Sequence, residues 1–147
     1  MTLTNPALSE LSVLLGRWRL EISNAEFLPD GETGLGTMEV STLDDAFVVI
    51  RSAADIEGPP RAISVVGRNE DRDDYTLLYS DDRGVSRIYA MTFAGGTWTQ
   101  HREDPGFHQH FEGTLDPDGD RITAEWSRSH DGGATWIHDF DLTYTRL

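Results

Sequence analysis

Hydrophobic and polar residues alternate along most of this chain, in short runs separated by glycine, proline and aspartate. A period of two puts successive side chains on opposite faces of a β-strand, and turn signals about every eight to twelve residues are typical of antiparallel domains. The pattern therefore predicts an all-β chain. We expect ten strands, at residues 17–24, 35–43, 46–54, 61–69, 74–80, 85–93, 97–103, 107–115, 121–128 and 135–146.

One short helix is predicted before the first strand. Asn5 is a suitable N-cap, Pro6 fits the first helical position, and Gly16 ends the segment. We expect the apolar face of this helix to pack near one end of the β structure. That face consists of Leu8, Leu11, Leu14 and Leu15.

The ten strands have to be arranged so that none presents an open edge. Closing them into a barrel removes every edge, so the predicted fold is a single antiparallel β-barrel domain over residues 1–147, with a two-sheet sandwich as the alternative. A chain of 147 residues is long enough to bury a real core. A barrel of this size can hold one small ligand or be filled by its own side chains.

Charge and composition exclude several classes of binding partner and site. The net charge is −14 and all twelve basic residues are arginine; this surface repels phosphate backbones and anionic lipid, so we expect no nucleic-acid and no membrane binding. There is no cysteine, and so no disulfide or thiolate metal site. The first residues lack the features of a signal peptide, which favours a cytoplasmic location. A homodimer stays open.

Two turns carry a related pattern. Residues 129–136 match S-x-D-x-G-x-T-W, the Asp-box hairpin of sialidase propellers, and residues 80–86 are a degenerate copy. A propeller would need blades of about 40 residues or more, and the chain has no such repeat. We therefore predict a structural role, in which Asp131 and Asp82 bind the amides of their own turns.

The run PGFHQHFEG, residues 105–113, contains an H-x-H pair. Strand alternation puts His108 and His110 on the face opposite the two phenylalanines, and so toward water. Zinc would need a third ligand there, from His101 or Glu112. We interpret the pair as the wet face of a strand and predict no metal site.

Two strands carry polar groups on an apolar face. In the last strand, alternation predicts that His138 and Tyr144 point inward, His138 either as a core residue or as a ligand contact. In strand 85–93, Arg87 and Tyr89 lie on the face with the larger side chains, which we expect to point inward. A buried cation needs an acid, a carbonyl or a ligand anion, so an internal salt bridge and an anionic ligand are both open.

Aromatic residues either line a pocket or fill the core. We include Tyr79 and Trp126 among the candidate ligand contacts, with Arg87, Tyr89, His138 and Tyr144. The register across the turn at residues 81–84 leaves either Leu78 or Tyr79 opposite Arg87.

Gly16-Arg17-Trp18, after the short helix, resembles the G-x-W signature of the calycins, the lipocalin and fatty-acid-binding barrels. Arg146 is similar in place to the basic residue that packs on that tryptophan, which implies a cation–π contact. Over nearly its whole length the chain resembles an uncharacterised bacterial family of calycin-like proteins, in residues 79–89, 105–107 and 136–146. The resemblance implies a calycin-like barrel and carries no known activity.

Two further resemblances bear on function. Arg87-x-Tyr89 is similar in chemistry to the R-x-Y pair that holds a carboxylate in fatty-acid-binding barrels. More distantly the chain resembles the nitrobindins, which bind haem through a histidine of the final strand, and His138 lies at a comparable distance from the end.

The sequence thus favours non-covalent binding of a small apolar or amphipathic molecule, with an anionic group as one option. It assigns no catalytic residue and requires no cofactor. Three alternatives stand beside this hypothesis. One is a haem protein with His138 as axial ligand, and another is an acid/base enzyme that pairs His138 with Tyr89 or Tyr144. The third is a barrel filled by its own side chains that acts through its surface or as a dimer.

Overall fold

The computed structural model describes residues 2–147, and its strands confirm the predicted all-β fold. Each expected strand is present, with its ends within two residues of the prediction. The strands are β1 (Gly16–Ser23), β2 (Gly34–Leu43), β3 (Phe47–Ala54), β4 (Ala62–Asn69), β5 (Asp74–Asp81), β6 (Ser86–Ala94), β7 (Thr97–Asp104), β8 (Phe107–Leu115), β9 (Arg121–Ser129) and β10 (Ile137–Arg146).

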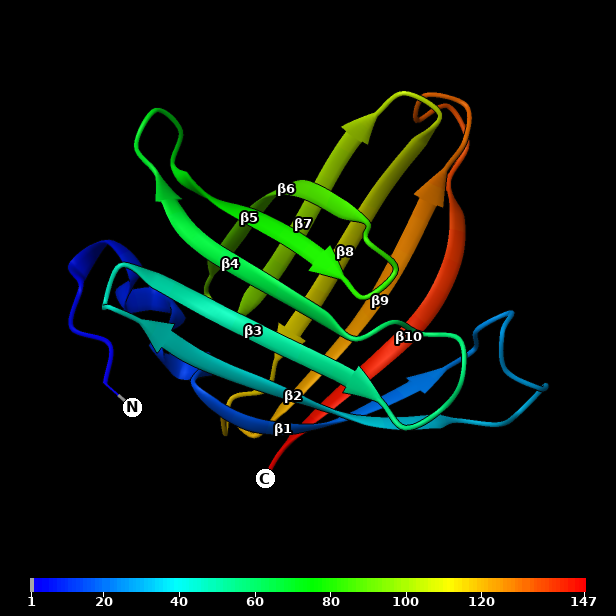
Figure 1. Cartoon of the computed structure of the whole chain (residues 1–147), viewed down its shortest axis with the longest axis horizontal. Coiled ribbons are helices and arrows are strands. Elements are labelled where there is room, and N and C mark those ends of the chain that lie inside the picture. Colours follow the sequence, from blue (N-terminus) through cyan, green and yellow to red (C-terminus); the bar gives the residue numbers. More distant parts are fainter. Residues whose placement is uncertain (1) are drawn as a thin grey trace.

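The ten strands form one closed antiparallel barrel, in the order β1-β10-β9-β8-β7-β6-β5-β4-β3-β2. Each strand pairs with its neighbours in sequence, and β1 closes the sheet by pairing with β10 (Figure 1). The alternative of a two-sheet sandwich is therefore wrong. Because closure leaves no free edge, all inward side chains meet in one interior.

The N-terminal segment forms the 3₁₀ helix η1 (Pro6–Leu14). The Asn5 side chain accepts a hydrogen bond from the Ala7 amide at 3.0 Å, so the predicted cap is present. Leu8, Leu11 and Leu14 are at most 1% exposed. Their spacing of three matches the three-residue period of a 3₁₀ helix, which explains why all three face the barrel. No helix in residues 2–147 is long and apolar enough to cross a membrane.

η1 covers the end of the barrel where β2 turns into β3. Asn5 and Thr4 hydrogen-bond Asp45, which lies in that turn. At the same end Arg146 packs its guanidinium 4.1 Å from the centre of the Trp18 ring. The guanidinium also donates to the carbonyl oxygens of Leu15 and Val13, at 2.9 and 2.5 Å. One arginine thus ties together the helix, the first strand and the last strand.

Gly16 is required by this contact. Its φ of +127° is a conformation that side-chain-bearing residues rarely adopt. A Cβ atom at this position would also lie 3.2 Å from an Arg146 guanidinium nitrogen. Both constraints explain the glycine of the G-x-W motif in this chain.

Candidate functional site: a cavity inside the barrel

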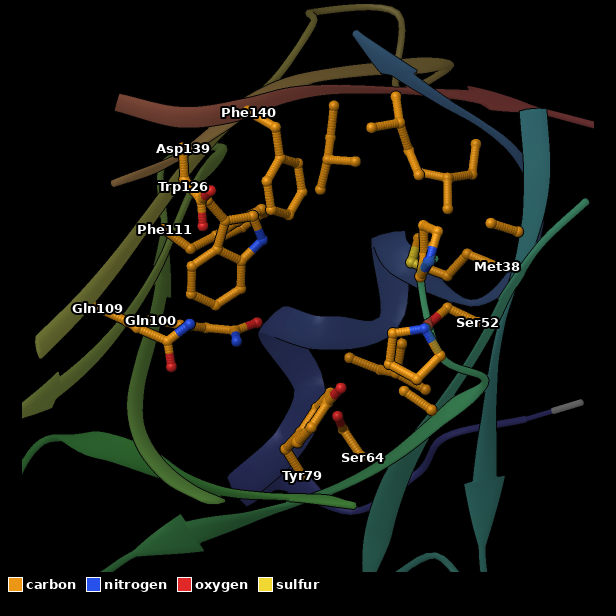
Figure 2. Close-up of a pocket in the computed structure, with 18 of the residues that line it drawn as sticks. Met38, Ser52, Ser64, Tyr79, Gln100, Gln109, Phe111, Trp126, Asp139 and Phe140 are labelled. Atoms are coloured by element: carbon orange, nitrogen blue, oxygen red, sulfur yellow. The ribbon is translucent and has the colours of Figure 1, made fainter. Parts of the chain in front are cut away.

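The barrel encloses a cavity of about 450 Å³, within the range of small-molecule sites. Its lining includes Gly58, Pro59 and Pro60 from the β3–β4 loop and Arg83 from the β5–β6 turn. These turns lie at the end of the barrel opposite the β2–β3 turn, so the cavity opens away from η1. Figure 2 shows η1 behind the cavity. The interior is thus hollow at one end and packed at the other.

One wall of the cavity is apolar and the other aromatic. Leu20, Ile22, Met38 and Leu142 line the apolar side. On the other side, the Trp126 ring centre lies 5.6 Å from that of Tyr89 and 5.1 Å from that of Phe111. Figure 2 shows Trp126 and Phe111 on the side of the cavity opposite Met38. The expected aromatic contacts Tyr79, Tyr89, Trp126 and Tyr144 all line this cavity.

Arg87 lies at the mouth of the cavity, in the second residue of β6. The register of the hairpin places Tyr79 opposite it, which settles the open choice between Leu78 and Tyr79. The Arg87 guanidinium carbon lies 5.9 Å from the Tyr79 ring centre and 5.4 Å from that of Phe107.

The internal salt bridge considered for Arg87 is not formed. Within residues 2–147, no carboxylate oxygen lies within 4.0 Å of its guanidinium. By contrast Arg83, also at the mouth, pairs with Asp81 at 2.7 Å. The Arg87 guanidinium thus lies beside aromatic rings and the Tyr89 hydroxyl, next to the cavity, with no carboxylate partner in the described chain.

Two buried tyrosines differ in their hydrogen bonds. Tyr89 donates to Oε1 of Gln109 at 2.7 Å, and burial raises the pKa of its hydroxyl. Burial also raises the pKa of Tyr144, whose hydroxyl has no hydrogen-bond partner in the described residues. Both hydroxyls are therefore neutral at physiological pH and able to bind a neutral polar group.

His138 does not point into the barrel, contrary to the prediction. A β-bulge between His138 and Phe140 places one extra residue on β10. The shift by one residue inverts the faces on the N-terminal side of the bulge, so Asp139 lines the cavity and His138 lies outside. Beyond the bulge Leu142 and Tyr144 face inward as predicted.

This bulge removes the geometric basis of two alternatives. No histidine of residues 2–147 lines the cavity, so the interior does not fit a haem held by His138. The proposed acid/base pairing of His138 with Tyr89 or Tyr144 is not formed either, because the two tyrosines are inside the barrel wall and His138 is outside.

On the outer surface His138 Nε2 lies 2.8 Å from Asp141 Oδ1. Glu125 pairs with Asp141 across the strands, and one donor atom from each of these three residues falls within 4.8 Å of the others. Partial burial acts to raise the pKa of Asp141, but hydrogen bonds from Asn24 and His138 lower it overall.

His108 and His110 lie on the outer face, as alternation predicts, each with its ring centre 6.4 Å from that of Trp136. In the described chain no third donor converges on them.

The two Asp-box turns differ in which aspartate is used. Asp131 accepts hydrogen bonds from the Thr135 amide and the Ser129 hydroxyl, both at 2.8 Å, and these bonds lower its pKa. In the shorter turn the expected Asp82 makes no such bond in the described chain. Asp81 accepts from the Arg83 amide at 2.9 Å instead. The loop between β5 and β6 is shorter than the loop between β9 and β10, and in it the turn amides are bound by the preceding aspartate. The prediction that Asp82 binds them is therefore wrong.

Two glutamines are among the cavity residues that the sequence analysis missed. Gln100 and Gln109 are both 7% exposed and line the cavity. They are the only glutamines in the chain. Each occupies an inward position of a predicted strand, Gln109 between Phe107 and Phe111 and Gln100 next to Trp98 on the same face, and that signal could have identified them.

The barrel is similar to one of known structure. The crystal structure of Rv2717c from M. tuberculosis matches with a TM-score of 0.67 over 97% of this chain and 98% of that chain, at 14% sequence identity. At this identity the similarity concerns the fold alone. No protein-family model matches the chain, and no curated protein matches its sequence.

Proposed function

We propose that this protein binds a small amphipathic anion in the barrel, with the anionic group at Arg87 and the apolar part against the aromatic wall. The observation that carries the proposal is that Arg87, half-buried at the cavity mouth, has no acidic partner among the described residues. The chain contains 26 aspartates and glutamates, so acidic residues are plentiful elsewhere. A cation in such a place is stabilised by an anion that arrives with the ligand.

The surroundings of Arg87 support an anionic rather than a neutral ligand. Tyr79 and Phe107 lie within 6 Å of the guanidinium and the Tyr89 hydroxyl lies near it, but no carboxylate or carbonyl oxygen of the described residues pairs with its N–H donors. Guanidinium donors match a carboxylate or sulfonate in a bidentate arrangement. The calycin-like resemblance agrees with such a role, and the net charge of −14 disfavours large polyanions.

Titration with 8-anilinonaphthalene-1-sulfonate, an aromatic anion that fluoresces when bound in an apolar site, tests this proposal. We expect Arg87→Met to weaken its binding about tenfold or more, since a charge-assisted hydrogen bond is lost. Arg87→Lys keeps the charge but loses the planar guanidinium, so its affinity should lie between those of the wild type and Arg87→Met. Arg121→Met, an exposed arginine on β9, is the matched control. Equal affinities for Arg87→Met and the control would contradict the proposal.

A further inference from the structure

The two glutamines of the cavity lie next to each other on paired strands. Gln109 is opposite Arg102 in the β7–β8 ladder and Gln100 is opposite Phe111, so the two amides are diagonal neighbours on one inner face. Figure 2 shows both side chains entering the cavity from the side that also carries Trp126 and Phe111. The two amide groups of this wall thus lie close together inside the cavity.

These amides have unused hydrogen-bonding capacity. Oε1 of Gln109 accepts from Tyr89, but neither its Nε2 nor any side-chain atom of Gln100 has a partner in residues 2–147. They are not sealed into the protein either. The described side-chain atoms that are both sealed and unpaired belong to Asp74, Trp98, Arg102 and Arg128. The free amide groups of Gln100 and Gln109 therefore open onto the cavity.

The hydrogen-bonding groups of a primary amide determine which ligand group can pair with it. It presents a donor and an acceptor side by side, and it pairs in a bidentate manner with a group that offers an acceptor beside a donor, such as a ring lactam or imide. The flat faces of Trp126 and Phe111 beside the amides suit a planar ring. A plain hydrocarbon chain would leave both amides buried without partners, which is costly.

The distance to Arg87 sets the size of the ligand. Tyr89, whose hydroxyl already contacts Gln109, is two residues beyond Arg87 on β6, or about 7 Å along the strand. Gln100 is opposite Met91, four residues beyond Arg87, or about 13 Å. An anionic group at the mouth and a polar edge at the amides are thus separated by roughly the length of a fused two-ring system.

We infer that the ligand is a planar heteroaromatic anion whose inner edge carries adjacent N–H and C=O groups, read by Gln100 and Gln109. This inference rests on the proposed function, because the anion at Arg87 positions the ring. It excludes a simple fatty acid as the matched ligand and identifies the two glutamines as the residues that determine specificity.

A matched pair of acids tests the inference by isothermal titration calorimetry. 2-Quinolone-6-carboxylate and 2-naphthoate share the fused two-ring frame and the charge, and they differ in the lactam N–H and C=O of one edge. We expect the quinolone to bind at least about tenfold more tightly to the wild-type protein. Gln100→Met should remove this preference, because the lactam edge loses its partner and 2-naphthoate no longer leaves the Gln100 amide unpaired. Thr114→Met, exposed on β8, is the control and should keep the preference.

Thermal unfolding of each variant verifies that it is folded, and Gln100→Leu provides a second apolar replacement. Equal affinities of the two acids for the wild-type protein, or a preference that survives both Gln100 variants, would overturn the inference. In that case binding of 2-naphthoate that depends on Arg87 would still support the proposed function. If neither acid binds, the proposed function fails and the inference fails with it.

Discussion

Arg146 and Arg87 occupy opposite ends of the same barrel, and both hold a guanidinium against aromatic rings. Arg146 lies 4.1 Å from the Trp18 ring centre and donates to three carbonyl oxygens, those of Leu15, Val13 and Gly119. Arg87 lies more than 5 Å from the ring centres of Tyr79 and Phe107 and has neither a carbonyl nor a carboxylate partner in the described residues.

The two arginines differ in whether their N–H donors are used within the protein, and this distinguishes a stabilising role from a ligand-binding role. Where a cation donates to several carbonyl groups of the protein, its removal leaves those groups unpaired and destabilises the fold. Where the donors face a cavity, the cation contributes little to folding and remains available to a ligand. The closed end of this barrel is thus fastened by Arg146, and under the proposed function the open end, with Arg87, binds the ligand.

The largest expected effect concerns the closed end. We predict that Arg146→Met lowers the free energy of unfolding by about 2 to 3 kcal/mol, because charge-assisted hydrogen bonds to three carbonyl groups are lost. Urea unfolding measures this change, and Arg121→Met serves as the control for loss of a surface charge. A change for Arg146→Met as small as that of the control would show that the closed end does not depend on this contact.

A smaller, pH-dependent effect is expected in the Asp-box turn at the open end. Hydrogen bonds from the Thr135 amide and Ser129 lower the pKa of Asp131 in the folded state. The stabilisation is therefore fully present above the ordinary aspartate pKa of about 3.9 and is lost as the pH falls through the lower folded value.

Asp131→Asn tests this prediction through urea midpoints measured across pH. We expect the variant to be less stable than the wild type at neutral pH, with a difference that shrinks below about pH 4. A difference that is independent of pH would show that the charge of Asp131 does not matter.

At the cavity mouth, Arg87→Met is predicted to change the free energy of unfolding by no more than about 0.5 kcal/mol, while the affinity for an aromatic anion falls. The same urea titration used for Arg146→Met gives a direct comparison of the two ends. A loss of stability comparable to that of Arg146→Met would mean that Arg87 is a structural residue.

The smallest effect is expected for His138. Because the bulge turns this side chain out of the cavity, His138→Ala should leave the affinity for 8-anilinonaphthalene-1-sulfonate unchanged. Fluorescence titration of the variant beside the wild type measures this. A clear loss of affinity would indicate that β10 moves His138 inward when a ligand binds.

The sequence predicted those features that depend on local patterning. Strand alternation and turn residues located all ten strands, and alternation placed Tyr89 and Tyr144 on inward faces; the inward positions of Tyr79 and Trp126 were left open. These predictions succeed because a strand with one buried face has a period of two that is visible in the sequence.

The errors arise where one residue changes the register. The extra residue in β10 has no distinctive sequence signal, yet it inverts the orientation of His138. In the same way the shorter loop after β5 moves the capping role from Asp82 to Asp81. The pairing state of Arg87 depends on which carboxylates come near in three dimensions, and alternation along one strand cannot give that.

A crystal structure of the protein with 6-bromo-2-naphthoate tests the central claim most directly, because anomalous scattering locates the bromine without ambiguity. We predict that the carboxylate lies against the Arg87 guanidinium and that the bromine lies inside the barrel, beside Gln100. A bromine peak on the outer surface, or an acid bound with its carboxylate away from Arg87, would contradict the account.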